Sequence, residues 1–214
     1  MSVFVDSAII AEVQEAANWG WIAGVTTNPS LLAQSPLPPR ETLQKIAEVL
    51  DGLIFYQLTA PTFKEMMHEA AEAESILHNK LVLKIPATSL GFQAAAHLSA
   101  EHCCAITTIF SPVQALLAVA CKARYAIYYH SRAKQWLADG AELGTQLIHL
   151  LAGCETTEVL AASFKSKQDV LEAAQAGVKH LTIKFALLKG LGEDEFTQQA
   201  IAEFNATGRG ILQQ

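Results

Sequence analysis

Short apolar segments rich in β-branched residues recur along the chain, and each precedes a segment of helical character. These segments are nearly continuous apolar runs, which is typical of parallel strands that are covered on both faces. They begin roughly 20 to 30 residues apart, the length of a strand-plus-helix unit. The predicted strands are Val3–Val5, Gly24–Thr26, Leu53–Gln57, Leu81–Ile85, Cys104–Thr107, Tyr125–Tyr129, Val159–Ala162 and Leu181–Ile183.

Helices are predicted between these strands from apolar spacing and from capping side chains. Apolar positions at helical spacing indicate a helix over Thr42–Leu50. Capping signals mark helix starts at Thr62–Glu65, Ser111–Pro112 and Ser166–Asp169. Alternating strands and helices are found in a (β/α)8 barrel or in a doubly wound sheet. Eight such units favour a single-domain (β/α)8 barrel of the TIM type.

Composition and charge narrow the function classes. The 214 residues are 51% hydrophobic and 17% charged, which provides enough apolar material for a large core and excludes a disordered chain. The formal net charge of −6 argues against a nucleic-acid partner. No uncharged apolar run is long enough to span a membrane, and the N-terminus lacks the features of a secretory signal. The four cysteines show no metal-binding spacing, so we expect reduced thiols in a cytoplasmic protein.

A helical tail is predicted after the last strand. We assign residues 1–189 to the barrel and residues 190–214 to the tail. Within the tail, Glu193–Phe204 carries Phe196, Ile201 and Phe204 at helical spacing, and two glycines precede it. This apolar stripe must be buried somewhere, either on the chain's own barrel or on another subunit.

Polar residues stand at the ends of nearly all predicted strands. In a (β/α)8 barrel the strand ends meet at one face, which carries the active site. A carboxylate, amides, a lysine and hydroxyls converging on one opening indicate a catalytic site. These residues are Asp6, Thr26, Thr27, Asn28, Gln57, Lys84, Thr107, Tyr129, Arg132, Ser163 and Lys184.

Lys84 and Asp6 are the candidates for covalent and acid–base chemistry. Lys84 lies within an apolar strand, where burying a cation is costly and a neutral amine is able to attack a ketone to form a Schiff base. The alternative is a strand-end lysine that extends to solvent. Asp6 is a candidate proton carrier, and the alternative is a helix cap supplied by Asp6 or Ser7. For His130 a surface or packing role is expected instead, and Trp19, Trp21 and Trp136 are expected to be packing residues.

Four motifs in the chain resemble the transaldolase family, in particular its small branch of fructose-6-phosphate aldolases and short transaldolases. The resemblance runs in order from Val3 to about Lys184. It implies a (β/α)8 barrel that uses no cofactor or metal and acts on a sugar phosphate. The motifs are GVTTNPS at 24–30, LKIP at 83–86, FSPVQALL at 110–117 and VLAASFK at 159–165.

The resemblance assigns a role to each candidate residue. Lys84 would be the Schiff-base lysine and Asp6 the proton-transfer carboxylate. Gln57 and Thr107 would hold the catalytic water. The remaining residues would bind substrate: Asn28 with the adjacent Thr27, Ser163 near the phosphate end, and Arg132 at the phosphate itself.

Two positions favour the aldolases over the short transaldolases within this family. The transaldolases usually carry glutamate at position 57 and phenylalanine at position 129, whereas this chain has Gln57 and Tyr129. A tyrosine hydroxyl is able to assist proton transfer at the enamine carbon. The chain departs from the family pattern at Tyr128, which replaces a proline, at 133–140, which lacks a glycine-rich loop, and at Lys184, where the position is normally uncharged.

We therefore expect an aldolase that reversibly cleaves fructose 6-phosphate into dihydroxyacetone and glyceraldehyde 3-phosphate. One alternative is a transaldolase that transfers the dihydroxyacetone unit between sugar phosphates in the pentose phosphate pathway. Another is a sugar-phosphate-binding barrel with weak catalysis. The resemblance also implies a homo-oligomer, a pentamer or decamer, in which the C-terminal helix packs on a neighbouring subunit.

Overall fold

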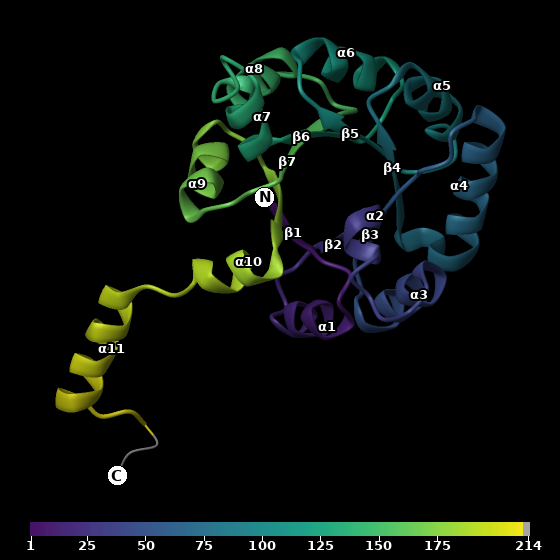
Figure 1. Ribbon diagram of the computed structural model, residues 1–214. Coiled ribbons are helices and arrows are strands. Elements are labelled where there is room, and N and C mark those ends of the chain that lie inside the picture. Colours follow the sequence, from purple (N-terminus) through teal and green to yellow (C-terminus); the bar gives the residue numbers. More distant parts are fainter. Residues whose placement is uncertain (212–214) are drawn as a thin grey trace.

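Eight parallel strands pair in sequence order, and the last pairs with the first to close a barrel (Figure 1). The computed structural model describes residues 1–211. Every predicted strand is confirmed, with small extensions at the ends. The strands are β1 (Ser2–Asp6), β2 (Gly24–Thr26), β3 (Leu53–Gln57), β4 (Leu81–Pro86), β5 (Cys104–Ile109), β6 (Tyr125–Tyr129), β7 (Glu158–Ala162) and β8 (His180–Lys184).

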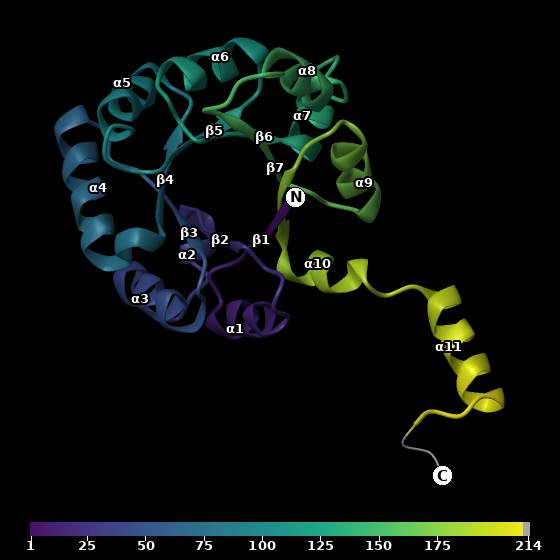
Figure 2. The same cartoon turned by 180° about the vertical axis from the view of Figure 1, so that it is seen from behind.

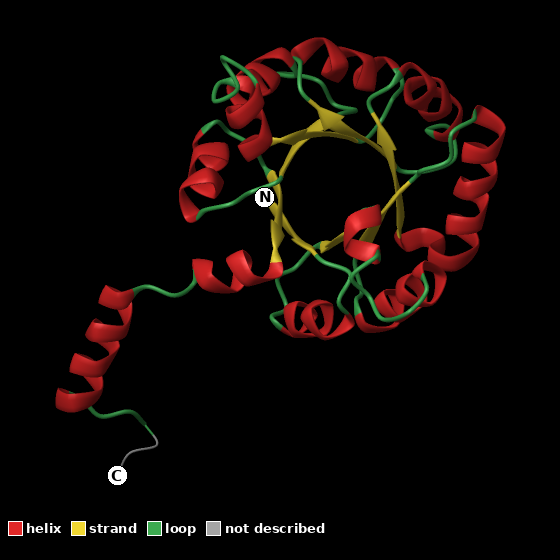
Figure 3. Ribbon diagram, viewed as in Figure 1, coloured by secondary structure: helices red, strands yellow, loops and turns green. Residues whose placement is uncertain are grey.

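Apart from the short α2 (Pro29–Leu32), which lines the cavity opening, and α11 (Glu195–Thr207), the helices surround the barrel on its outer side, which confirms the predicted (β/α)8 architecture (Figure 3). None of the described helices is long and apolar enough to cross a membrane. The helices are α1 (Ile10–Asn18), α2 (Pro29–Leu32), α3 (Pro39–Val49), α4 (Phe63–Leu77), α5 (Ser89–Leu98), α6 (Pro112–Ala120), α7 (His130–Trp136), α8 (Leu143–Leu150), α9 (Lys167–Gln175), α10 (Phe185–Leu191) and α11 (Glu195–Thr207), with a short 3-10 turn at His78–Lys80.

The barrel interior is a packed layer of side chains from alternate strand positions. The ring of Phe55 contacts Phe4 and Tyr125, at centroid distances of 5.1 and 5.4 Å, although these residues belong to non-adjacent strands. Successive side chains of a strand point to opposite faces, so residues two positions further along also face the interior. Asp6 and Gln57 follow Phe4 and Phe55 in this way. The chemistry-bearing residues therefore lie just above an apolar floor.

Two of the three predicted capping side chains form the expected hydrogen bond. The Thr62 hydroxyl accepts from the Glu65 amide at 3.3 Å, and the Ser166 hydroxyl accepts from the Asp169 amide at 3.1 Å. Ser111 precedes α6, but its side chain makes no capping bond. Instead, the Gln114 side chain folds back to accept from the Phe110 amide at 2.9 Å, so the start of this helix is organised by an amide.

The C-terminal helix α11 extends away from the barrel (Figures 1 and 2). None of its residues is buried, and Phe196 and Phe204 are each 71% exposed. It begins two residues later than predicted because Asp194 caps it, accepting from the Thr197 amide at 3.0 Å. Within one chain the apolar stripe is therefore not covered by the barrel. The last residues of the predicted tail, 212–214, lie outside the described residues.

Candidate active site

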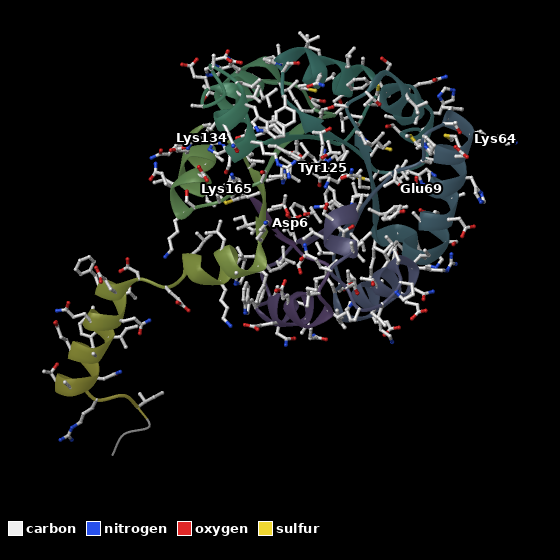
Figure 4. The ribbon with its side chains drawn as sticks, viewed as in Figure 1. Asp6, Lys64, Glu69, Tyr125, Lys134 and Lys165 are labelled. Carbon is white, nitrogen blue, oxygen red and sulfur yellow. The ribbon has the colours of Figure 1, made fainter. Side chains whose placement is uncertain are left out.

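A cavity of ≈ 440 Å³ opens at the C-terminal ends of the strands. It is lined by side chains from β1, from β3 and β4, from the ends of β6 and β8, and from the segments that follow β2, β6 and β7. Asp6 lies inside the ring of strands in the view along the barrel (Figure 4). The cavity brings together most of the predicted site residues: Asp6, Asn28, Gln57, Lys84, Tyr129, Arg132 and Ser163.

Lys84 projects from the middle of this site rather than toward solvent. It is only 4% exposed, and its Nζ donates a hydrogen bond to the carbonyl oxygen of Thr27 at 3.0 Å. The proposed extension to solvent is therefore wrong. Strand β4 is buried along nearly all of its length, and it places the amine in the cavity wall.

Asp6 stands at the end of β1, with its carboxylate turned into the cavity. It accepts a hydrogen bond from the Thr26 hydroxyl at 2.7 Å, and that hydroxyl also contacts the hydroxyl of Thr182. Burial raises the pKa of Asp6 above its ordinary value, although nearby Lys84 and the Thr26 hydrogen bond act in the opposite direction. A carboxyl group with a raised pKa is suited to both giving and taking a proton.

The capping alternative for Asp6 is wrong, because Ser7 organises the start of α1. The Ser7 hydroxyl accepts from the Ile9 amide at 3.1 Å and donates to the Glu12 carboxylate. Asp6 makes no bond to that helix start. The Asp6 carboxylate therefore does not cap α1 and is available for interactions in the cavity.

Two buried oxygen atoms flank β4 without a hydrogen-bond partner among the described residues, Gln57 Oε1 on β3 and Thr107 Oγ1 on β5. Gln57 stands beside Lys84 in the register of β3 and β4. Buried polar atoms of this kind ordinarily bind an ordered water. Thr107 is fully buried and is not among the residues that line the cavity, whereas its neighbour Thr108 is.

Asn28 and Thr27 differ in how they contact the cavity. The Asn28 Oδ1 caps the short helix α2 by accepting from the Leu31 amide at 3.0 Å, which fixes the side chain at the cavity wall. The Thr27 hydroxyl is buried and donates to the Phe55 carbonyl at 2.8 Å. Thr27 therefore contributes its backbone carbonyl, which holds Lys84, while its side chain stays outside the cavity lining.

The side of the cavity formed by β6, β7 and β8 is cationic. Arg132 lies with its guanidinium 4.9 Å from the ring centroid of Tyr129. Lys165 and Lys184 complete this side. Lys184 was among the strand-end candidates but had no assigned role, whereas Lys165 was not a candidate site residue. A strand-end position was the only signal for Lys184, and Lys165 follows β7 by three residues, where sequence spacing gives no direction for a side chain.

Strained backbone also marks this cavity. Ser163 and Thr108, both lining residues, have φ of +67° and +61°. Residues other than glycine rarely adopt a positive φ. This backbone conformation persists where the surrounding structure enforces it, often at functional sites. The Ser163 carbonyl accepts from the Ser131 amide at 3.2 Å, which joins the start of α7 to the segment after β7.

A second polar cluster lies outside the cavity, between α7 and α9. His130 is buried there, in agreement with the packing role that was one of its two expected roles. Its Nε2 lies 3.1 Å from the Glu172 carboxylate. His130, Asp169 and Glu172 have potential metal-ligand atoms close together. The Lys134 ammonium, however, contacts both carboxylates, at 3.0 and 2.6 Å, and supplies the positive charge. This cluster is a structural ion network between α7 and α9.

The tryptophans are only partly explained by packing. Trp19 packs against the core and stacks on Phe185. Trp21 and Trp136 are more than half exposed, so the packing prediction is wrong for both. Trp136 is the last residue of α7, and its ring centroid lies 5.3 Å from that of Phe110. The Arg132 guanidinium lies 5.9 Å from the centroid of the Trp136 ring. It therefore belongs to the surroundings of the phosphate-site candidate.

The chain matches the family model described as transaldolase/fructose-6-phosphate aldolase over residues 3–212. A probable transaldolase of Symbiobacterium thermophilum is 35% identical over 207 residues, covering 95% of each chain. A probable transaldolase of Alkaliphilus metalliredigens is 33% identical over 215 residues, covering 99% of this chain and 100% of its own.

Solved structures share the barrel architecture. A dihydrodipicolinate synthase of Rhodopseudomonas palustris superposes with a TM-score of 0.63 at 12% identity, over 96% of this chain and 79% of its own. A mandelate oxidase variant superposes with a TM-score of 0.60 at 16% identity, over 94% and 71%. At such low identity the likeness shows the fold alone.

Proposed function

Because the chain belongs to the transaldolase/fructose-6-phosphate aldolase family, we propose that it is a Schiff-base aldolase that reversibly cleaves fructose 6-phosphate. The products are dihydroxyacetone and glyceraldehyde 3-phosphate. One observation carries this proposal: Lys84 is buried in the cavity wall, in the same cavity as Asp6, the single carboxylate among the described lining residues. An amine nucleophile and a proton carrier in one cavity are what the reaction requires.

The covalent step follows from this pair of groups. The Lys84 amine attacks the ketone carbon of the sugar, and the resulting carbinolamine loses water to give an iminium. Asp6 delivers the proton that the departing water needs. The iminium nitrogen then accepts the electron pair of the breaking carbon–carbon bond, as the hydroxyl of the aldehyde fragment gives its proton to the Asp6 carboxylate. This releases glyceraldehyde 3-phosphate and leaves an enamine on Lys84.

Completion of the cycle uses the residues beside Lys84. Tyr129, whose ring lines the cavity, is placed to deliver the proton that converts the enamine carbon back to an iminium. A water held by Gln57 Oε1 and Thr107 Oγ1 then hydrolyses the iminium and frees dihydroxyacetone. Neither buried oxygen has another hydrogen-bond partner among the described residues, which supports this water site.

Substrate orientation is assigned to the remaining lining residues. Asn28 and the Thr27 segment bind hydroxyl groups near the Schiff base, while Ser163 and Arg132 bind the phosphate end. An arginine guanidinium offers several parallel donors to a phosphate. Among the described residues Arg132 forms no ion pair, and its guanidinium lies near the rings of Tyr129 and Trp136 at the cavity, which leaves its charge available to a phosphate.

The second candidate is a transaldolase, which keeps the enamine for a second sugar phosphate. The names of the relatives favour it, since those described above are probable transaldolases. Gln57 and Tyr129 favour the aldolase. Where the short transaldolases usually have phenylalanine, the Tyr129 hydroxyl is able to protonate the enamine, and where they usually have glutamate, the neutral Gln57 amide positions the water. A barrel that binds a sugar phosphate with weak catalysis is a third possibility, against which the presence of both Lys84 and Asp6 argues.

We further propose a cytoplasmic homo-oligomer, a pentamer or decamer, in which residues 1–189 form the barrel and residues 190–214 cross to a neighbouring subunit. The exposed apolar stripe of α11 supports an intersubunit role for this tail.

Borohydride trapping tests the nucleophile. Reduction in the presence of fructose 6-phosphate or dihydroxyacetone should attach a stable adduct to Lys84, located by peptide mass spectrometry. Lys84→Met should abolish the adduct while circular dichroism and the melting temperature stay near those of the parent. Lys165→Met serves as the matched control and should keep the adduct. Labelling of Lys165 or Lys184 in place of Lys84 would contradict the assignment.

A further inference from the structure

A further cation reaches the cavity at the end of β8. Lys184 is the last residue of that strand and follows Thr182, whose hydroxyl meets Thr26 inside the barrel. Strand alternation therefore directs Lys184 to the same interior side, and it lines the cavity. Its register partner on β1 is Asp6. Among the described residues Lys184 forms no salt bridge, so no carboxylate within bonding distance neutralises its charge.

The strand order places Lys184 and Arg132 on either side of Ser163. Ser163 follows β7, which pairs with β6 on one side and β8 on the other. Arg132 comes from the helix after β6, whose start is bonded to the Ser163 carbonyl through the Ser131 amide. A phosphate above Ser163 is thus reached by a guanidinium from one side and an ammonium from the other.

The balance of charge in the cavity agrees with a dianionic ligand. The basic lining residues are Lys84, Arg132, Lys165 and Lys184, against Asp6 as the single carboxylate among the described lining residues. Conversion of the Lys84 amine to a Schiff base does not remove the three other cations. A phosphate group carries close to two negative charges near neutral pH and satisfies two of them.

We propose that Lys184 is a specificity-determining residue that, together with Arg132, binds the phosphate of the sugar substrate across Ser163. This inference rests on the proposed function for the identity of the sugar. The phosphate contact itself does not depend on the covalent chemistry at Lys84. It predicts that the enzyme selects phosphorylated over neutral aldehydes more strongly than Arg132 alone would allow.

A rival role for Lys184 is to act only through Asp6. The charges of Lys84, Lys184 and Arg132 all act to lower the pKa of that carboxyl, against the larger effect of burial. If this were its only role, removing the charge would slow phosphorylated and neutral substrates equally and would shift the pH profile for both. The two roles are therefore separable by the choice of substrate.

Binding of glycerol 3-phosphate provides the direct test, because this probe carries the phosphate but has no carbonyl for Lys84 to attack. Lys184→Gln should weaken its affinity about tenfold in calorimetry, the size expected for one charged hydrogen bond. Lys184→Arg should restore most of the affinity. Lys189→Gln is the matched control, since Lys189 pairs with Glu15 on the outer surface at 2.8 Å and should leave the affinity unchanged.

The kinetic counterpart compares glyceraldehyde 3-phosphate with glyceraldehyde as acceptors of dihydroxyacetone. In Lys184→Gln the ratio of their kcat/KM values should fall about tenfold, as in the binding assay. An unchanged affinity for glycerol 3-phosphate, or an equal loss for both aldehydes, would overturn the proposal. Failure of the proposed function is distinguishable, because it would appear as the absence of a Lys84 adduct in the parent protein while glycerol 3-phosphate binding still reports on Lys184.

Discussion

The guanidinium of Arg132 lies 4.9 Å from the ring centroid of Tyr129 and 5.9 Å from the ring of Trp136. Two aromatic rings thus restrict a side chain that has no carboxylate partner among the described residues. Such restriction reduces the entropy that a phosphate ligand must overcome to order the arginine. It also connects an exposed tryptophan to the proposed phosphate site.

Trp136→Ala should therefore weaken phosphate binding without affecting the covalent step. A cation–π contact at an exposed site contributes about 0.5–1 kcal/mol, so the affinity for glycerol 3-phosphate should fall about two- to fivefold. Trapping of dihydroxyacetone on Lys84 should be unchanged. Trp21→Ala is the control, because Trp21 is also exposed but stacks on Trp19. Equal losses in the two variants would show that Trp136 does not act through Arg132.

Gln57→Glu should raise the transfer of dihydroxyacetone to erythrose 4-phosphate relative to free cleavage. The Gln57 Oε1 is buried and unpartnered beside Lys84, and a carboxylate there changes how the bound water is protonated. The ratio of the two products, measured by coupled assays on the same enzyme sample, reports the change. Gln14→Glu, on the outer surface of α1, is the control. An unchanged ratio would remove Gln57 as the discriminating position.

Asp6→Asn should abolish activity and at the same time stabilise the fold. Because burial raises the pKa of Asp6, the folded state binds a proton more readily than the unfolded state. Stability is therefore lost as the pH rises from the ordinary carboxyl pKa of about 4 through the raised value. The neutral amide avoids this cost at pH 7, and a gain of about 1 kcal/mol would raise Tm by about 2–4 °C. A lower Tm in the variant would contradict this account.

Asp169→Asn should destabilise the protein at neutral pH. Burial alone would raise the pKa of Asp169, but hydrogen bonds from Lys134, Ser131 and the Lys165 amide outweigh it and hold the pKa well below its ordinary value. The stabilisation is therefore complete above about pH 4 and is lost as the pH falls through the lowered value. The expected loss is about 1–3 kcal/mol at pH 7, measured by urea unfolding.

The pH dependence separates this network from a simple packing defect. The difference in unfolding free energy between parent and Asp169→Asn should shrink as the pH falls below about 4, because the parent loses the same interaction. A difference that stays constant down to pH 2 would indicate that the carboxylate charge contributes nothing. Lys45→Gln is a suitable control, since its pair with Glu48 is exposed and contributes little.

The strands were predictable because each is a nearly continuous apolar run. Parallel strands of a barrel are covered on both faces, so they require apolar residues at successive positions. The capping hydroxyls of Thr62 and Ser166 were predictable because they act within one turn of chain. Lys165 and the rim position of Trp136 were not, because their directions depend on how the segments after β6 and β7 pack together. The absence of a Ser111 side-chain cap was also not predictable, because it depends on tertiary contacts. The Gln114 side chain accepts from the Phe110 amide and donates to the Ala87 carbonyl, and so organises the start of α6.

Removal of α11 should reduce the oligomeric state. The exposed Phe196, Ile201 and Phe204 side chains form an apolar surface that the barrel of the same chain leaves uncovered. Multi-angle light scattering should show a ring-sized homo-oligomer for the full chain and a smaller species for a chain ending at Gly192, which leaves α10 complete. Phe196→Ser combined with Phe204→Ser should have the same effect while keeping the helix. A monomeric full chain, or an oligomer unchanged by both alterations, would contradict this.

The hydroxyl contact between Thr26 and Thr182 joins residues 156 positions apart and supports the Asp6 carboxylate. Lys184 is the neighbour of Asp6 in the same seam, where β8 pairs with β1. During synthesis on the ribosome, the first strand must wait for nearly the whole barrel before the Asp6 carboxyl acquires these surroundings. Contacts that are so distant in sequence form late in folding. Activity should thus emerge only with closure of the barrel, which makes catalysis a sensitive reporter of the final folding step.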